Sequence, residues 1–171
     1  MNKHLVRVLE DYPRLVTERN SLIQQLTHFK GVSVEEVIDS MYTPKFEREY
    51  METGRIADKT GEIAVTYKER RDQINHEWHG YLEKKLARMD EEIKFFEASI
   101  DALSEQYRPV MKDLYLNGHT WDSIEGLHNV SRTTIARYRK KAIAEMSAFY
   151  DLREKVLNEF LSVFDYCVIP G

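Results

Sequence analysis

The clearest pattern of hydrophobic and polar positions lies in residues 131–146, towards the C-terminal end of the chain. Ile135, Tyr138, Ala142 and Met146 recur at intervals of three or four residues, which places them on one face of a helix. Ser131 stands directly before this stretch and can accept a hydrogen bond from a backbone N–H of the first turn. The pattern predicts a helix that begins after Ser131 and buries one apolar face.

A shorter helix is predicted just before it, over residues 120–128. Thr120 can cap its start, and Ile124 and Leu127 supply an inward-facing side. Gly126 is the small residue that close packing between two helices favours, and Gly118 suits the end of a preceding helix. Two helices joined by a short turn are typical of a helix-turn-helix unit.

The charge of this region differs from that of the chain. Residues 131–146 hold five Lys or Arg and one acidic residue, a local net charge of +4, whereas the chain of 171 residues carries −4. The outward positions of the predicted helix are Arg132, Thr133, Ala136, Arg137 and Lys140. A solvated basic face on an ordinary helix is the alternative, but the short helix upstream favours insertion into a DNA major groove.

These residues also carry a family resemblance. The segment VSRTTIARYRKKAI resembles the promoter-reading helix of the sigma-factor region-four domain, and the likeness extends back through LSEQYRPVMKDLYLNG. More of the chain, about residues 5–146, resembles the RinA/ArpU-type phage and prophage transcriptional regulators. VLEDYPRLVTERNSLIQQL and DKTGEIAVTYKERRDQI carry this second resemblance. It implies a phage late-gene activator that binds promoter DNA and has no enzymatic activity.

The resemblance and side-chain chemistry together assign roles to single residues. Base reading falls to Arg132, Thr133, Ala136 and Arg137, because arginine can bind guanine O6 and N7 with two hydrogen bonds. Ala136 stands where the sigma family has an arginine, so one base contact is expected to be missing. The expected phosphate contacts are Thr120, Thr134, Arg139, Lys140 and Lys141.

A second strong pattern runs from about residue 62 to residue 103. Its apolar positions are spaced 4, 4, 3, 4, 3, 4 and 3 apart: Trp78, Leu82, Leu86, Met89, Ile93, Phe96, Ile100 and Leu103. Such a heptad seam can pair with a second chain or pack on another helix of its own chain. We expect a helical hairpin with the N-terminal segment that also takes part in self-association, through Leu82, Leu86, Met89, Ile93, Phe96 and Ile100.

The remaining segments complete an all-α prediction. Residues 2–29 have helical periodicity interrupted by Pro13, which either kinks the helix or lies early in a second one. Ser33 and Glu36 form a capping box for a short helix, and residues 42–60 are expected to be a connector. Pro109 indicates a late start or a kink in the helix over 105–116.

Three regions are therefore expected. Residues 1–103 form the helical hairpin and coiled-coil-like oligomerisation region, residues 104–146 the helix-turn-helix domain, and residues 147–171 an amphipathic helix and tail. The apolar positions of this tail are Phe149, Leu152, Val156, Phe160 and Phe164. The tail either folds back on the DNA-binding region or serves as an oligomerisation helix.

Other functional classes find little support in the sequence. His76 and His79 lie three apart on a helix, which fits a surface pair better than a metal site, and no cofactor is expected. Cys167 is the only cysteine, and residues 1–13 lack the long apolar region of a signal peptide. No run of apolar residues approaches the length of a membrane span. The expected setting is the cytoplasm of a bacterial host. A phage small terminase subunit and a sigma-like partner of RNA polymerase remain the alternative functions.

Overall fold

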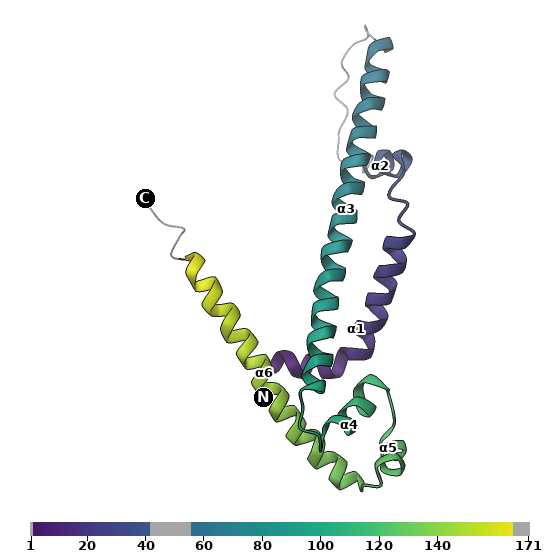
Figure 1. Cartoon of the computed structure of the whole chain (residues 1–171). Helices are drawn as coiled ribbons and strands as arrows, with labels where there is room; N and C mark the ends of the chain where they lie inside the picture. The colour runs from purple at the N-terminus through teal and green to yellow at the C-terminus, as the bar shows by residue number, and fades with distance from the viewer. Residues whose placement is uncertain (1, 42–55, 166–171) are drawn as a thin grey trace. The chain divides into compact units, whose positions relative to one another are not determined.

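The computed structural model describes residues 2–41 and 56–165, with side chains over residues 2–37 and 67–162. Within these residues every regular element is a helix, so the chain is all-α as predicted (Figure 1). The elements are α1 (Lys3–Thr27), α2 (Val34–Met41), α3 (Ile56–Asp101), α4 (Arg108–Met111), the π-helical turn η1 (Lys112–Leu116), α5 (Trp121–His128) and α6 (Arg132–Asp165). Most of the predicted connector 42–60, and Cys167, lie outside the described residues.

The chain divides into two compact units. Unit 1 contains residues 1–18 and 89–171, and unit 2 contains residues 19–88. These boundaries differ from the predicted regions because the first part of α1 and the last part of α3 share a core with α6.

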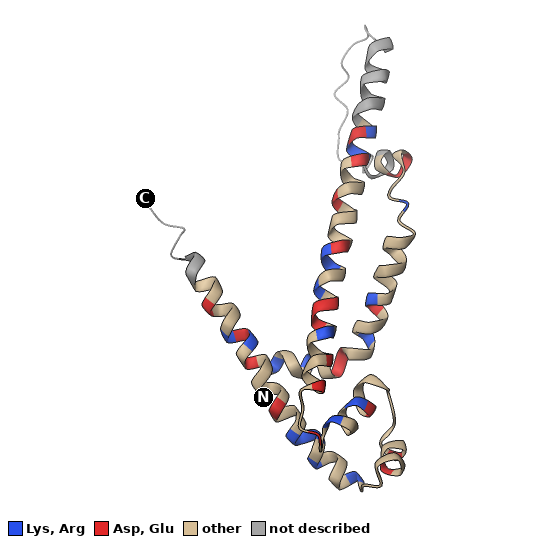
Figure 2. Ribbon diagram, viewed as in Figure 1, with Lys and Arg blue, Asp and Glu red and all other residues tan. Residues whose placement is uncertain are grey.

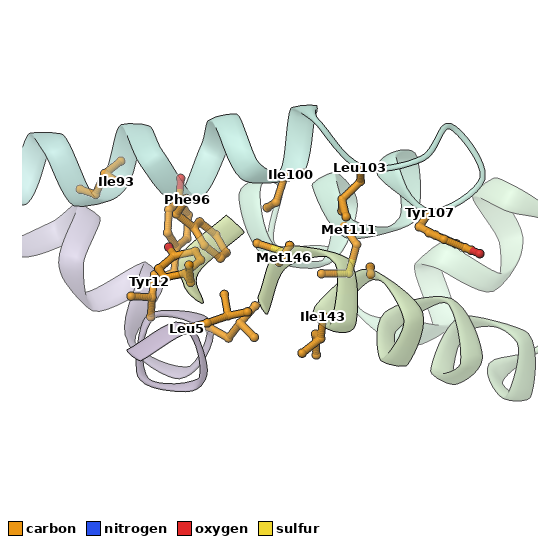
Figure 3. Close-up of a cluster of buried hydrophobic side chains, with 14 residues drawn as sticks. Leu5, Tyr12, Ile93, Phe96, Ile100, Leu103, Tyr107, Met111, Ile143 and Met146 are labelled. Carbon is orange, nitrogen blue, oxygen red and sulfur yellow. The ribbon is translucent and has the colours of Figure 1, made fainter. Parts of the chain in front are cut away.

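The larger hydrophobic core of unit 1 has contributions from four helices (Figure 3). α3 supplies Ile93, Phe96 and Ile100, and the link to α4 adds Leu103 and Tyr107. The other buried members come from α1, α4 and α6: Leu5, Val8, Leu9, Tyr12, Met111, Ala142, Ile143, Met146 and Tyr150. Phe96 is fully buried and stacks at a tilt on Tyr12, with ring centroids 4.8 Å apart.

This core corrects part of the prediction for the heptad seam. Ile93, Phe96 and Ile100 were expected to pack on the N-terminal helix of the same chain and also to take part in self-association; they are buried against α1 and α6 of the same chain, which leaves them no exposed surface for a second chain. Leu82 is also buried, within unit 2, whereas Leu86 and Met89 are half-buried. The spacing is the same for both kinds of packing, and in unit 1 the N-terminal helix and α6 take the place of a partner.

The start of α1 is fastened to α6 by one side chain. Asn2 Oδ1 accepts hydrogen bonds from the backbone N–H groups of His4 (2.9 Å) and Leu5 (3.2 Å), which caps the helix. Its amide nitrogen donates to Asp151 Oδ1 at 2.8 Å and to Glu154 Oε2 at 3.3 Å. Helix α1 continues through Pro13. Of the two predicted possibilities, a second helix that begins near Pro13 is therefore wrong.

Unit 2 packs the end of α1 and the following loop on α3. Gly31 has a φ of +68°, and a Cβ there would lie 2.5 Å from the side chain of Asn75. Asn75 in turn accepts from Val32 N (2.7 Å) and donates to Val32 O (3.2 Å), which fixes the loop. Phe29 meets Trp78 and His79 edge-on, so His79 has a packing role.

The predicted capping box at the start of α2 is confirmed. Ser33 Oγ accepts from Glu36 N at 3.1 Å, and Glu36 Oε2 accepts from Ser33 N at 2.7 Å. These reciprocal bonds satisfy two backbone donors that the helix itself leaves unpaired.

We expect Phe96→Ala to lower the free energy of unfolding by about 3–5 kcal/mol, because it removes a fully buried ring and leaves a cavity. The control is Lys94→Ala, an exposed position on the same helix, which should change it by less than about 0.5 kcal/mol. Denaturant titration measures both. Equal effects of the two substitutions would contradict the placement of Phe96 in the core.

Candidate nucleic-acid interface

The helix predicted over residues 105–116 begins only at Arg108, which agrees with the late start that Pro109 indicated. α4 starts at Arg108 with the proline in its first turn, where a missing N–H costs nothing. The Arg108 guanidinium donates to Leu103 O at 2.8 and 3.1 Å, which fixes the link from α3. The segment continues as the π-helical turn η1 and ends near Gly118, whose φ is +68°.

α5 matches the predicted short helix in its bounds and its cap. Thr120 Oγ1 accepts a hydrogen bond from Ser123 N at 3.3 Å, and the helix ends at His128. Asn129 follows in the left-handed conformation, with φ +50° and ψ +46°, and turns the chain towards α6. Asparagine tolerates this conformation better than most residues do.

A small second core holds α5 against α4 and α6. Its buried members are Val110, Ile124 and Ile135, one from each of these helices. Leu114, Val130 and Tyr138 are partly buried and pack against it. Tyr138 also packs on the large core, so the two cores are continuous along α6.

Two details of α5 differ from the prediction. Leu127 was expected to face inward with Ile124, but its side chain is 60% exposed. Gly126 was expected to allow close packing, yet a Cβ there would meet nothing within 4 Å. A helix of only two turns has room for one fully buried position here, and Ile124 takes it.

The start of α6 is capped as predicted, and its buried stripe is confirmed. Ser131 Oγ accepts from Thr134 N at 3.3 Å. Ile135, Ala142 and Met146 are fully buried, and Tyr138 is half-buried. The opposite face is exposed and contains Thr133, Ala136, Arg137 and Lys140, which recur at helical spacing.

Arg132 lies at the start of α6, but carboxylates of α5 hold it. Its guanidinium forms an ion pair with Asp122 Oδ1 and a longer contact of 3.3 Å with Glu125 Oε2. The other oxygen of Glu125 accepts the backbone N–H of Arg132 at 2.6 Å. Arg132 is 61% and Asp122 74% exposed, so water and salt screen this pair and it is weak.

Sequence reasoning missed this arrangement. Asp122 and Glu125 are three residues apart and so share one side of α5, which is the only signal that the sequence contained. Which cation faces them depends on the turn at Asn129.

The other expected DNA contacts have different surroundings. Arg139 Nε donates to the Tyr115 hydroxyl at 2.8 Å, which directs this arginine towards η1. Thr134 is half-buried, with its hydroxyl 3.1 Å from that of Ser131. Lys140, Lys141 and Thr120 are exposed. The exposed cations of α6 therefore include Arg137, Lys140 and Lys141, with the Arg137 guanidinium carbon 5.9 Å from the Tyr138 ring centroid. Figure 2 shows Lys and Arg gathered along this part of the helix.

Asp113 of η1 connects η1 to α5 and to the loop between them. Its carboxylate lies 2.6 Å from His128 Nε2 and 3.5 Å from His119 Nδ1, and it accepts from Asn117 Nδ2 at 2.7 Å. Burial by itself would raise the pKa of Asp113. Hydrogen bonds from Asn117 and His128 and the charges of the two histidines outweigh burial, so the pKa is lowered.

Within residues 2–37 and 67–162, no three His, Cys, Asp or Glu side chains are grouped to hold a metal ion. Among the described helices, none is long and apolar enough to cross a membrane. Comparison with known proteins finds no matching family model, curated protein or solved structure.

We expect Asp113→Asn to lower the free energy of unfolding by about 1–3 kcal/mol at pH 7, because charge-assisted hydrogen bonds are lost. The folded-state pKa is lowered, so the carboxylate stabilises the fold above its ordinary pKa of 3.8. This contribution disappears as the pH falls through the folded-state pKa.

Urea titrations at pH 7 and at about pH 2.5 would measure the difference between wild type and variant. The difference should shrink at the lower pH. Glu105→Gln, at an exposed position of the same unit, should show almost no difference at pH 7. A difference for Asp113→Asn that stays constant with pH would contradict the role of the carboxylate.

Proposed function

We propose that this protein is a sequence-specific DNA-binding transcriptional regulator that inserts the first part of α6 into the major groove. The observation that carries the proposal is the exposed face of α6, where Thr133, Arg137 and Lys140 lie opposite the buried stripe. α5 packs across α6 through Ile124 and Ile135, which is the support that a recognition helix needs. The resemblance to RinA/ArpU-type regulators adds the finer proposal of a phage late-gene activator.

The division of roles on α6 follows from side-chain chemistry. Arg137 reads a guanine with two hydrogen bonds, and Thr133 reaches a base edge or a thymine methyl group. Lys140, Lys141 and Thr120 bind phosphates, which set the position of the helix without reading sequence. Ala136 leaves a short apolar surface on this face, which suits contact with a thymine methyl group.

Arg132 differs from Arg137 because its guanidinium is already paired with Asp122 and Glu125. DNA must displace these carboxylates before it can bind Arg132. A phosphate offers anionic oxygens like those of a carboxylate, a guanine offers the neutral acceptors O6 and N7, and the exposed ion pair costs little to exchange. The two carboxylates also repel phosphates of wrongly placed DNA. Asp122 and Glu125 therefore weaken binding to any DNA site that does not offer Arg132 an acceptor in exchange for the ion pairs it loses.

Selection of bound sequences from random duplexes, followed by footprinting on phage DNA, tests the proposal. A single preferred site upstream of a late promoter is the expected result. Protection of a packaging site would favour a small terminase subunit. Failure to bind any duplex, together with co-purification of RNA polymerase, would favour a sigma-like partner of the polymerase; either outcome would contradict the proposed regulator.

We expect Arg137→Ala to weaken binding to the selected site by about 1–3 kcal/mol and to relax the preference at one base pair. Lys141→Ala should weaken selected and random DNA equally and reduce the salt dependence by about one phosphate contact. Titrations of both duplexes at several salt concentrations separate these effects. Equal losses on both duplexes for Arg137→Ala would remove it from base reading.

We expect Asp122→Asn to strengthen binding to random DNA, because it removes a charge that repels phosphates and frees Arg132. The gain should be largest at low salt and should shrink as salt screens the pair. Glu69→Gln, the same change in charge at an exposed position in unit 2, is the control and should leave affinity unchanged. Weaker binding by Asp122→Asn would show that the carboxylate orients Arg132 for DNA instead of competing with it.

A further inference from the structure

Helix α3 exposes two aromatic rings within unit 2. Tyr81 is 62% and Trp78 41% exposed, and the two residues lie three positions apart on the helix. Phe29 packs edge-on against Trp78, with ring centroids 5.2 Å apart, whereas none of the described side chains packs a ring on Tyr81. The Tyr81 ring is therefore available to a ligand.

Two cations lie on the same side of α3 as Tyr81. Lys84 and Arg88 follow it at intervals of three and four residues, which places the three side chains on one narrow face of the helix. Both cations are exposed, and neither forms an ion pair among the described residues. We name the surface formed by Trp78, Tyr81, Lys84 and Arg88 the α3 strip.

The nearest carboxylates of α3 leave this strip positive. Glu83 is two residues from Tyr81 and so lies on the other side of the helix, with its Oε2 3.5 Å from His79 Nδ1. Glu77 lies one turn before Tyr81 and accepts a hydrogen bond from Gln73 Nε2 at 2.9 Å. The strip therefore ends at Glu77 and is positive from Tyr81 to Arg88.

The surroundings of the strip in unit 2 are also basic. Residues 19–34 and 70–88 pack together through Phe29 on Trp78 and through the hydrogen bonds between Val32 and Asn75. These two segments hold seven Lys or Arg and three Asp or Glu, a local net charge of +4 in a chain that carries −4. Such a local excess of positive charge attracts a polyanion.

We propose that the α3 strip binds single-stranded nucleic acid, with unpaired bases stacked on Tyr81 and Trp78 and phosphates bound by Lys84 and Arg88. Surfaces that bind single strands combine these two parts, aromatic rings for the bases and cations for the backbone. From Trp78 to Arg88 the helix rises about 15 Å, the length of about four nucleotides at a stacked spacing of ~3.4 Å. The proposal goes beyond duplex binding by α6 and does not depend on it.

The exposed rings favour a single strand over other anionic partners. A duplex keeps its bases paired, so cations alone would bind its phosphates and the rings would have no partner. A helix that lies on an anionic bilayer buries aliphatic side chains as well as aromatic ones. Among the described residues of unit 2, however, the large apolar side chains that are exposed are those of Trp78 and Tyr81. Unpaired bases use both the rings and the cations.

The first test measures binding of the full-length protein to labelled oligothymidylate and oligouridylate of equal length by fluorescence anisotropy. Binding is expected, and Tyr81→Ala should weaken it at least about fivefold because one stacked base is lost. Tyr81→Phe keeps the ring and should bind as the wild type does. Trp78 is left unchanged because it also supports Phe29. Circular dichroism melting confirms that the variants fold.

The second test measures the contribution of the cations. Lys84→Gln and Arg88→Gln should each weaken binding and reduce the slope of log affinity against log salt by about 0.7, the value for one phosphate of a single strand. Lys68→Gln removes an exposed cation of α3 outside the strip and should leave this slope unchanged.

Several results would overturn the proposal. One is the absence of binding to either oligonucleotide at low salt, and another is binding that Tyr81→Ala leaves intact. Equal losses for Tyr81→Phe and Tyr81→Ala would exclude stacking on the ring. Binding to vesicles of anionic phospholipid, without binding to the oligonucleotides, would assign the strip to a membrane surface. Where binding follows the expected pattern, the oligonucleotide that binds more tightly identifies RNA or DNA as the ligand.

This proposal and the proposed duplex binding can fail separately. Tyr81→Ala should leave binding to the selected duplex unchanged, and Arg137→Ala should leave binding to the oligonucleotides unchanged. Loss of oligonucleotide binding in Arg137→Ala, with none in Tyr81→Ala, would place single-strand binding on α6 and overturn the role of the α3 strip.

Discussion

Burial of one face of α6 is the interaction on which the rest of unit 1 depends. Ile135 packs with Val110 and Ile124 near the start of the helix, and Met146 packs with α1 and α3 further along. Tyr138 contacts both clusters. One continuous helix, α6, thus contributes to both the large core and the small core that holds α5. The rotation of α6 about its own axis decides which of its side chains face outward. Because Ile135 must be buried, Arg137 and Lys140 must be exposed.

Much of this arrangement could be predicted from local sequence. Caps are local, so Ser131, Thr120 and the pair of Ser33 and Glu36 were predicted from residues no more than three positions apart. The buried stripe of α6 was predicted from its period. Pro109 likewise marked the late start of α4 because proline lacks a backbone donor.

Features that depend on which other segment packs against a helix could not be predicted from local sequence. The heptad spacing around Phe96 is compatible with a second chain and with α1, and only the folded chain shows that α1 and α6 occupy that face. Leu127 has the right spacing for burial, but α5 is too short to bury it as well as Ile124. The ion pairs of Arg132 depend on a left-handed residue, Asn129, between the helices.

The net negative charge of the chain is compatible with the proposed DNA binding because acidic and basic residues are unevenly distributed. In the proposed DNA-binding role, the net charge of −4 disfavours contact with phosphate over most of the chain, whereas α6 exposes Arg137, Lys140 and Lys141; Asp122 and Glu125 pair with the nearby Arg132. For the proposed regulator, one α6 helix offers few phosphate contacts, so a single copy would bind a duplex weakly. Two copies bound at neighbouring half-sites would double the phosphate contacts and the base contacts without adding positive charge to either chain. In the proposed regulator, binding of two copies rather than a more basic surface would therefore supply the affinity, and it would do so only at sites that offer two suitably spaced copies of the sequence.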